Sequence, residues 1–375
     1  MNSVKILHTA DLHLGSSRTN VPGGKAEIEN AFFKIINTCK SQAVDFLLIA
    51  GDLFDTPFAD PDLVSRVISA MEQIPDTIIA ISPGNHDCAC PGSVYLKYEF
   101  PKNVAVFSSF LEYIDFPEKN VRLWGAGFTD SFERLPLLNS LDSKSTDMIN
   151  LCVLHGELVA ENSPSSYNPI YPFAIQKSDF DYLALGHIHK RSEVQKLGNT
   201  HFAYSGCHTG RGFDELGALG VYLGEVSKNN VNLEFLEIPS RQYILASIDV
   251  TECQNTFEVS QKVQNRLKND FGDKFADNLY RITLTGTLAI DTSISANQLK
   301  SILSESFFYV EVIDKCDTDI GDIESIAAET SLRGIFAGKM LEKINSVSDE
   351  EQEKYKNALK FGLCAFSKGV GLYDN

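Results

Sequence analysis

Five short stretches of this sequence place histidine, aspartate and asparagine directly after apolar runs. The stretches read ADLH, GDLFD, GNHD, LHGE and GHIH, and their polar residues include Asp11, His13, Asp52, Asp55, Asn85, His86, His155, His187 and His189. Ligand sites in open α/β sheets gather outside the carboxyl ends of the strands, so loops that follow such strands can meet at one rim. Desolvated carboxylates crowded at one rim repel one another unless cations lie between them. The pattern therefore predicts a site for divalent metal ions.

Each stretch taken alone also has an ordinary structural explanation. The D-x-H and G-N-H-D sequences occur in turns, and His187 and His189 could be two core histidines whose hydrogen bonds are satisfied. On an extended chain these two histidines would share one face, because side chains alternate along a strand. The joint appearance of the stretches, each at the end of an apolar run, favours metal binding over turns.

The runs that would position these residues are typical of buried parallel strands, which read as near-continuous apolar sequence. They are VKILHTAD, DFLLIAGD, TIIAISPGNHD, INLCVLHGE and DYLALGHIH. Residues 25–42 and 60–74 separate the first three runs and carry apolar side chains at helical spacing. HFAYSG, GALGVYLGEV and VNLEFLEI read as antiparallel strands without helices between them. Residues 1–240 are therefore predicted to form an α/β sandwich domain.

The order of predicted strands and helices changes from about residue 241. Residues 241–319 alternate as β-α-β-α-β, which predicts a second, smaller α+β domain. Residues 320–375 read as two helices whose apolar stripes include Ile335, Phe336, Leu341, Ile344, Leu359, Phe361, Leu363 and Phe366. Two lone helices cannot bury all of this apolar surface on each other. The remainder would dock on the chain's own domains or bind a partner.

Composition limits the class of partner. The 375 residues carry a formal net charge of −17. A free-standing nucleic-acid binder is usually basic, because lysine and arginine displace condensed counterions, so action on DNA would require metal ions or a partner protein to supply the attraction. The eight cysteines form no C-x-x-C pair, no apolar run is long enough for a membrane helix, and no secretion signal is visible. We expect a reduced, cytoplasmic protein with no membrane contact.

The order D-x-H, G-D-x-x-D, G-N-H-D, H-G, G-H-x-H resembles the calcineurin-like metallophosphoesterase superfamily. The motifs together with the residues around them, as in LHTADLHLGSS, VDFLLIAGDLFD and LALGHIHK, resemble the SbcD-type DNA repair exonucleases, which are bacterial relatives of the Mre-eleven nuclease. YSGCHTGRGFDELGALGVYLGEV is similar to the YhaO-like branch of that family. The resemblance rests on motifs over residues 4–240. Over residues 241–375 it rests only on the order of the predicted helices and strands. It implies a metallophosphoesterase β-sandwich flanked by helices, with residues 241–319 as a capping domain and residues 320–375 as a C-terminal helical segment.

The resemblance also implies two metal ions that share one carboxylate. The first ion would take Asp11, His13, Asp52 and His189. The second would take Asp52, Asn85, His155 and His187. A bridging carboxylate is physically reasonable, since its two oxygens can span metals about 3.5–4 Å apart. Nitrogen and oxygen ligands without a thiolate fit manganese, iron or zinc, and we expect Mn²⁺.

Four further residues have weaker predicted roles. His86 follows a ligand without being one, which makes it the candidate general acid for the leaving oxygen, with a structural turn histidine as the alternative. Arg211 and His208 could contact phosphate, Arg211 with a bidentate geometry. Asp55 could contact substrate too, although some relatives have histidine there, and it could equally cap a helix before Pro57.

The predicted function is a metal-dependent phosphodiesterase acting on DNA ends, a 3′→5′ exonuclease that could also cut single strands internally. One alternative is a phosphoesterase for cyclic nucleotides or other small substrates, which the acidic charge favours and the C-terminal extension opposes. Another is a non-catalytic subunit of an SMC-like ATPase complex, which the full ligand set opposes. The resemblance implies that the C-terminal helices bind an SbcC-type ATPase and that two copies of the chain could form a homodimer.

Overall fold

The structure is a computed structural model that describes residues 3–17, 21, 23–140, 147–289, 292, 294–319 and 321–368. The chain divides into two compact units, Met1–Gln242 and Tyr243–Asn375. No helix in the described ranges is long and apolar enough to cross a membrane.

The first unit contains two six-stranded sheets. One has the order β14-β13-β1-β2-β3-β4, built from β1 (Ser3–Thr9), β2 (Phe46–Ile49), β3 (Ile78–Ile81), β4 (Val104–Val106), β13 (Gly220–Ser227) and β14 (Asn230–Glu237). The other has the order β11-β12-β10-β7-β6-β5, built from β5 (Ser109–Phe116), β6 (Val121–Gly127), β7 (Ile149–His155), β10 (Tyr182–Gly186), β11 (Gln195–Leu197) and β12 (Thr200–Tyr204). Strands β1 to β4 are parallel, as are β6, β7, β10 and β12. A short parallel pair, β8 (Glu157–Leu158) and β9 (Pro169–Ile170), lies outside both sheets.

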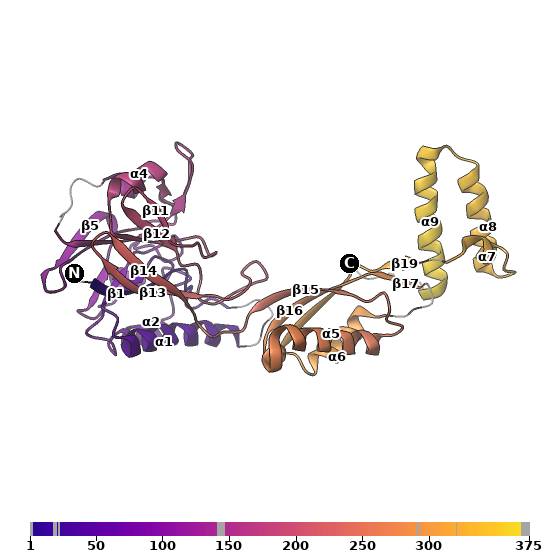
Figure 1. Cartoon of the computed structure of the whole chain (residues 1–375), viewed down its shortest axis with the longest axis horizontal. Coiled ribbons are helices and arrows are strands. Elements are labelled where there is room, and N and C mark those ends of the chain that lie inside the picture. Colours follow the sequence, from indigo (N-terminus) through magenta and orange to yellow (C-terminus); the bar gives the residue numbers. More distant parts are fainter. Residues whose placement is uncertain are drawn as a thin grey trace. The chain divides into compact units, whose positions relative to one another are not determined.

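Strand alternation produces the layers of this unit. Ile6, Phe46 and Leu48 belong to the core between the sheets, together with Leu151 and Ala184 of the second sheet. The sequence neighbours of Ile6, Phe46 and Leu48 point the other way and pack against α1 (Gly24–Gln42) and α2 (Pro61–Met71). The outer face of the second sheet packs against α4 (Pro172–Ser178), and α3 (Val94–Lys97) is a single turn. Figure 1 shows α1 and α2 along one side of the unit and α4 on the opposite side. The predicted sandwich flanked by helices is confirmed.

The second unit begins with a three-stranded parallel sheet, order β15-β16-β18. Its strands are β15 (Tyr243–Asp249), β16 (Leu279–Thr285) and β18 (Tyr309–Asp314), and α5 (Thr256–Phe271) and α6 (Ala296–Ser304) share its apolar core. A second parallel pair, β17 (Thr287–Ala289) with β19 (Asp317–Asp319), was not predicted. The described residues also include short 3₁₀ turns at Pro117–Lys119, Leu137–Ser140 and Gly272–Asp277.

In the part of the chain that the structure describes, three helices rather than the predicted two follow β19. They are α7 (Ile323–Ala327), α8 (Leu332–Asn345) and α9 (Asp349–Lys368). The predicted first helix is split because Ser331 is an N-cap: its hydroxyl accepts a hydrogen bond from the Gly334 backbone N at 3.1 Å, and a new helix begins there. The apolar periodicity alone gave no sign of this break.

Candidate metal centre

The predicted ligands follow strands β1, β2 and β3 of one sheet and β10 of the other, and His155 is the last residue of β7. Two backbone hydrogen bonds tie the first two loops together, from Asp11 N to Gly51 O at 3.1 Å and from His13 N to Asp52 O at 2.8 Å. Asp11, His13 and Asp52 all have positive φ, at 53°, 47° and 51°, and His187 has φ 100°. Such backbone costs about 1–3 kcal/mol per non-glycine residue and persists only where surrounding structure over-determines it, most often at functional sites.

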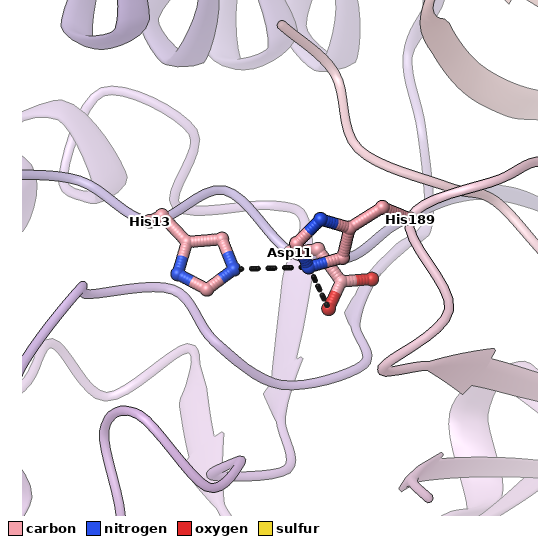
Figure 2. Close-up of side chains that lie close together, drawn as sticks. All are labelled: Asp11, His13 and His189. Carbon is pink, nitrogen blue, oxygen red and sulfur yellow. Dashed lines mark hydrogen bonds and ion pairs between the residues drawn. The ribbon is translucent and has the colours of Figure 1, made fainter. Parts of the chain in front are cut away.

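Asp11, His13 and His189 form the first cluster of donor atoms, and Figure 2 shows their side chains pointing toward one another. Nε2 of His13 lies 3.3 Å from Nε2 of His189, and the latter atom lies 3.8 Å from Oδ1 of Asp11. One donor atom from each residue lies within 4.8 Å of the others. A single ion could therefore contact all three side chains.

Asp52 connects this cluster to the second group of predicted ligands. Its Oδ2 lies 3.7 Å from Nε2 of His13 and 3.5 Å from Nε2 of His155. Oδ1 of Asn85 in turn lies 3.0 Å from Nε2 of His155 and 3.2 Å from Nδ1 of His187. The structure thus brings all of the predicted ligands into one continuous cluster with Asp52 in the middle.

Two glycines in the motifs make room for these contacts. Gly51 has φ 90°, and a Cβ there would collide with the His155 imidazole. A Cβ on Gly84 would collide with the Asp52 carboxylate. Glycine is therefore required next to both residues, which explains its place in GDLFD and GNHD.

Burial sets the protonation of the cluster. Desolvation lowers the pKa of His13 to about 4, of His155 to about 3 and of His187 to about 4, so these imidazoles are neutral near pH 7. Desolvation also raises the pKa of Asp11 to about 8. Neutral imidazoles are the form that binds metals, and a nearby divalent cation reverses the cost of a buried carboxylate. The donor set and its electrostatics fit divalent metal ions.

The family profile of the calcineurin-like phosphoesterases matches residues 4–191, half of this chain. This chain belongs to that family. The predicted resemblance is confirmed, and the protein is a metal-dependent phosphoesterase. This phosphoesterase is 30% identical over 303 residues to the metallophosphoesterase YhaO of Bacillus subtilis, covering 76% of this chain and 73% of YhaO.

Two further relatives have names that state a nuclease or repair role. The phosphoesterase is 23% identical to the SbcD component of the SbcCD nuclease of Staphylococcus epidermidis, over 93% of this chain and all of that protein. It is 27% identical to the DNA double-strand break repair protein Mre11 of Methanococcus maripaludis, over 72% of each chain. The family implies divalent metals at the site described above.

A second layer of hydrogen bonds orients the histidines of the phosphoesterase. Oδ1 of Asp55 lies 3.1 Å from Nδ1 of His13, and Oε1 of Glu215 lies 2.6 Å from Nδ1 of His189. Nδ1 of His155 donates to the carbonyl oxygen of Ala50 at 2.9 Å. Each bond leaves Nε2 of the same ring directed at the cluster, which is how ligand histidines are commonly fixed. Glu215 was missed from the sequence, where its only signal is a carboxylate in the loop that also carries Arg211.

Arg211 links the two carboxylates of this second layer. Its Nη1 lies 3.6 Å from Oδ1 of Asp55 and its Nη2 3.3 Å from Oε1 of Glu215. Burial acts to raise the pKa of Glu215, but the hydrogen bond with His189 and the charge of Arg211 lower it to about 2. Arg211 also lines an open cavity of about 370 Å³ with Ser16 and Asp55. Contact between Arg211 and a substrate phosphate stays a prediction.

Two predictions for residues around the site need correction. His208 is fully buried and its Nε2 donates to the Ile28 carbonyl oxygen at 3.2 Å, which removes it from the residues that could contact a substrate. The alternative helix-cap role for Asp55 is also wrong. Asp60 caps α2 instead, because its Oδ1 accepts from the backbone N atoms of Asp62 and Leu63, each at 3.1 Å.

His86 lies at the open side of the cluster. Its side chain is 46% exposed, and its ring centre is 4.7 Å from that of His13. Its backbone N donates to Oδ1 of Asp52 at 2.9 Å, which fixes the loop, while its Nδ1 lies 4.0 Å from Oδ1 of Asp55. Nε2 of His86 is therefore the ring atom that can face a substrate.

Proposed function

We propose that this phosphoesterase hydrolyses phosphodiester bonds of DNA as a 3′→5′ exonuclease. We propose in addition that it can cut single strands internally. The observation that carries the proposal is the position of Asp52, whose Oδ2 lies within 3.7 Å of His13 Nε2 and 3.5 Å of His155 Nε2. One carboxylate shared by two imidazole groups suits a pair of metals about 3.5–4 Å apart, the arrangement used for in-line phosphodiester hydrolysis. The nuclease names of two relatives support DNA as the substrate.

The proposed ligand sets are those predicted from the sequence, with Mn²⁺ first and iron or zinc as alternatives. Bound there, divalent ions would offset charge on the phosphoryl oxygens and acidify a water for attack. Asp11 and Asp52 would neutralise much of the metal charge, while neutral His155 and His187 supply nitrogen donors. His86, protonated at Nε2, would donate that proton to the leaving 3′ oxygen, a contribution of about 10²–10⁴-fold.

The competing small-substrate function shares the same metal centre, so substrate tests must separate the two. Purified protein with Mn²⁺ is assayed on 3′-labelled and 5′-labelled DNA and on cyclic nucleotides. We expect stepwise shortening from 3′ ends and at most slow hydrolysis of cyclic nucleotides. The reverse preference would overturn the nuclease proposal, and absence of any hydrolysis by the metal-loaded protein would favour a non-catalytic subunit.

We also propose that α7, α8 and α9 bind an SbcC-type ATPase. Ala337, Ile344, Leu359 and Leu363 are buried in the small core that these helices share. Leu332 and Phe361 stay 76% and 75% exposed, and such apolar surface tends to mark partner sites. A partner would also help an acidic chain to reach DNA, because a net charge of −17 repels phosphates. A homodimer stays a prediction from the family resemblance.

A further inference from the structure

Three aromatic rings lie one behind another beside the metal centre. The Tyr167 ring centre is 4.7 Å from that of His187 with 35° between the planes, and the Phe132 ring centre is 5.9 Å from that of Tyr167 at 36°. His187 is half-buried among the candidate ligands, whereas Phe132 is 52% exposed. We name Phe132 and Tyr167 the aromatic ledge. Its rings lead from a candidate metal ligand to solvent.

Hydrogen bonds hold the ledge in place relative to the centre. Glu133 N donates to Ser166 O at 2.9 Å, and Asn168 N donates to Glu133 O at 2.5 Å, so the two segments that carry the rings are paired. Buried Asn168 has φ 45°, and its Nδ2 donates to the carbonyl oxygen of the candidate ligand His155 at 2.8 Å. Its Oδ1 accepts from Leu137 N at 2.9 Å. The ledge is therefore fixed to the end of β7.

An exposed ring beside this centre has a chemical use in an acidic protein. Nucleobases stack on aromatic side chains whatever their sequence, so a ring supplies affinity that does not depend on a basic surface. The Arg134 guanidinium lies 5.8 Å from the centre of the Phe132 ring and places one positive charge beside the ledge. Ring and charge together suit a nucleotide, which has an aromatic base and an anionic phosphate.

We propose that the aromatic ledge stacks an unpaired nucleobase next to the scissile phosphate. The inference rests on the proposed nuclease function and narrows its substrate class to single-stranded or frayed 3′ ends. A base within a duplex has both faces covered by its neighbours, so it must leave the stack before it can lie on Phe132. Stacking of this kind should depend little on base identity, because every base has an aromatic face.

The test uses the full-length protein and a single-stranded oligonucleotide with 2-aminopurine at its 3′ end, whose fluorescence falls when the base stacks. Ca²⁺ replaces Mn²⁺ to slow hydrolysis during binding. We expect quenching with the wild type, and loss of quenching with Phe132→Leu, which keeps apolar volume and removes the ring. Phe132→Ala should raise Kd about 5- to 150-fold, the range for one lost base stack.

Phe173 provides a matched control on α4. It is 39% exposed, stacks on Tyr171 with ring centres 5.8 Å apart, and has the Lys177 ammonium 5.6 Å from its ring centre. Phe173→Leu should leave quenching and Kd unchanged. If the Phe132→Leu and Phe173→Leu variants quench 2-aminopurine fluorescence equally, and the wild type degrades DNA, the proposed role of the aromatic ledge is wrong while the proposed nuclease function stands. A wild type that hydrolyses cyclic nucleotides but binds no oligonucleotide would overturn the proposed function and the ledge with it.

Discussion

Oε1 of Glu215 lies 2.6 Å from Nδ1 of His189, although neither the motif nor the strand pattern pairs these two residues. The contact fixes the imidazole with Nε2 toward Asp11 and gives the ring a negative partner on its far side. Such outer partners typically change metal affinity about 10- to 100-fold when removed.

Glu215→Gln should therefore weaken one of two Mn²⁺ binding steps by about 10- to 100-fold and leave the other unchanged. Calorimetric titration of metal-free protein measures both steps. Asp214→Asn, an exposed change in the same loop, is the control and should bind both ions normally. Equal weakening of both steps would show that Glu215 supports the whole cluster and not His189.

Asp52→Asn should lower both metal occupancies together, because the variant loses the one charge shared by the two proposed ions. Elemental analysis after gel filtration measures the occupancies. Asp11→Asn is the comparison and should lower only one. Thermal stability in Mn²⁺ should fall further for Asp52→Asn, since bound ions stabilise the folded state by mass action. Loss of a single ion in Asp52→Asn would reject the bridging assignment.

His86→Ala should reduce kcat by about 10²–10⁴-fold while metal content stays at the wild-type level. The reason is its exposed side chain beside His13, which can reach a substrate and is not among the proposed ligands. His201→Ala on β12 removes a half-buried histidine that is not one of the predicted site residues and serves as the control. Full activity in His86→Ala would mean that water or another residue protonates the leaving oxygen.

Metal binding should release protons near pH 7 and progressively fewer above about pH 9. Burial raises the pKa of Asp11 to about 8, so its carboxyl holds a proton in metal-free protein that an ion must displace. His13, His155 and His187, with pKa values lowered to about 4, 3 and 4, have none to release. Burial acts to lower the pKa of His189, but its hydrogen bond with Glu215 and the charge of Asp11 raise it, so this ring adds to the release near pH 7. Titrations in buffers of different ionisation enthalpy count the protons. A release that does not change with pH would contradict the raised pKa of Asp11.

The same shifts give the metal-free protein a stability that depends on pH. Asp11 has a folded pKa of about 8 against 3.8 unfolded, so its contribution is present at low pH and is lost as pH rises through that window. The three histidines have folded values below 6.5, so their contribution is lost as pH falls from 6.5 through about 4. As the pH rises from about 6.5 to 8, Asp11 should therefore lower the free energy of unfolding of the metal-free protein, and His189, whose pKa is also raised, acts in the same direction. Urea denaturation of metal-free protein at each pH measures this fall, and a free energy of unfolding that stays constant over this range would contradict it.

Leu332→Glu combined with Phe361→Glu should abolish co-purification with a co-expressed SbcC-type ATPase. Both side chains are largely exposed, so the fold and the metal content should survive the change. Phe257→Glu on α5 alters another largely exposed ring, 63% accessible, outside the helical segment and is the control. Loss of the complex in the control alone would place the partner site on residues 241–319 and contradict the role of α7, α8 and α9.

The sequence by itself predicted the candidate ligands of the centre. Asp11, Asp52 and His187 could be found because each directly follows an apolar strand, and strand periodicity and turn position are local properties of the chain. The carboxyl ends of parallel strands share one edge of a sheet, so Asp11 and Asp52 were expected to meet there, whereas His187 follows a strand of the other sheet. The change to a regular β-α-β-α-β order is also a local property, and it predicted that residues 241–319 form a domain separate from the sandwich.

Only the tertiary structure decided which other side chains those residues touch. Glu215 reaches His189 because the loop before β13 of one sheet meets the loop after β10 of the other. Asp55 reaches His13 across neighbouring loops of one sheet, and Tyr167, which precedes β9, lies on His187. His208 has the same local surroundings in sequence as Arg211, yet the fold buries it against the Ile28 carbonyl oxygen. Contacts of this kind join residues far apart in the chain, and their geometry depends on how layers pack, which no local periodicity encodes.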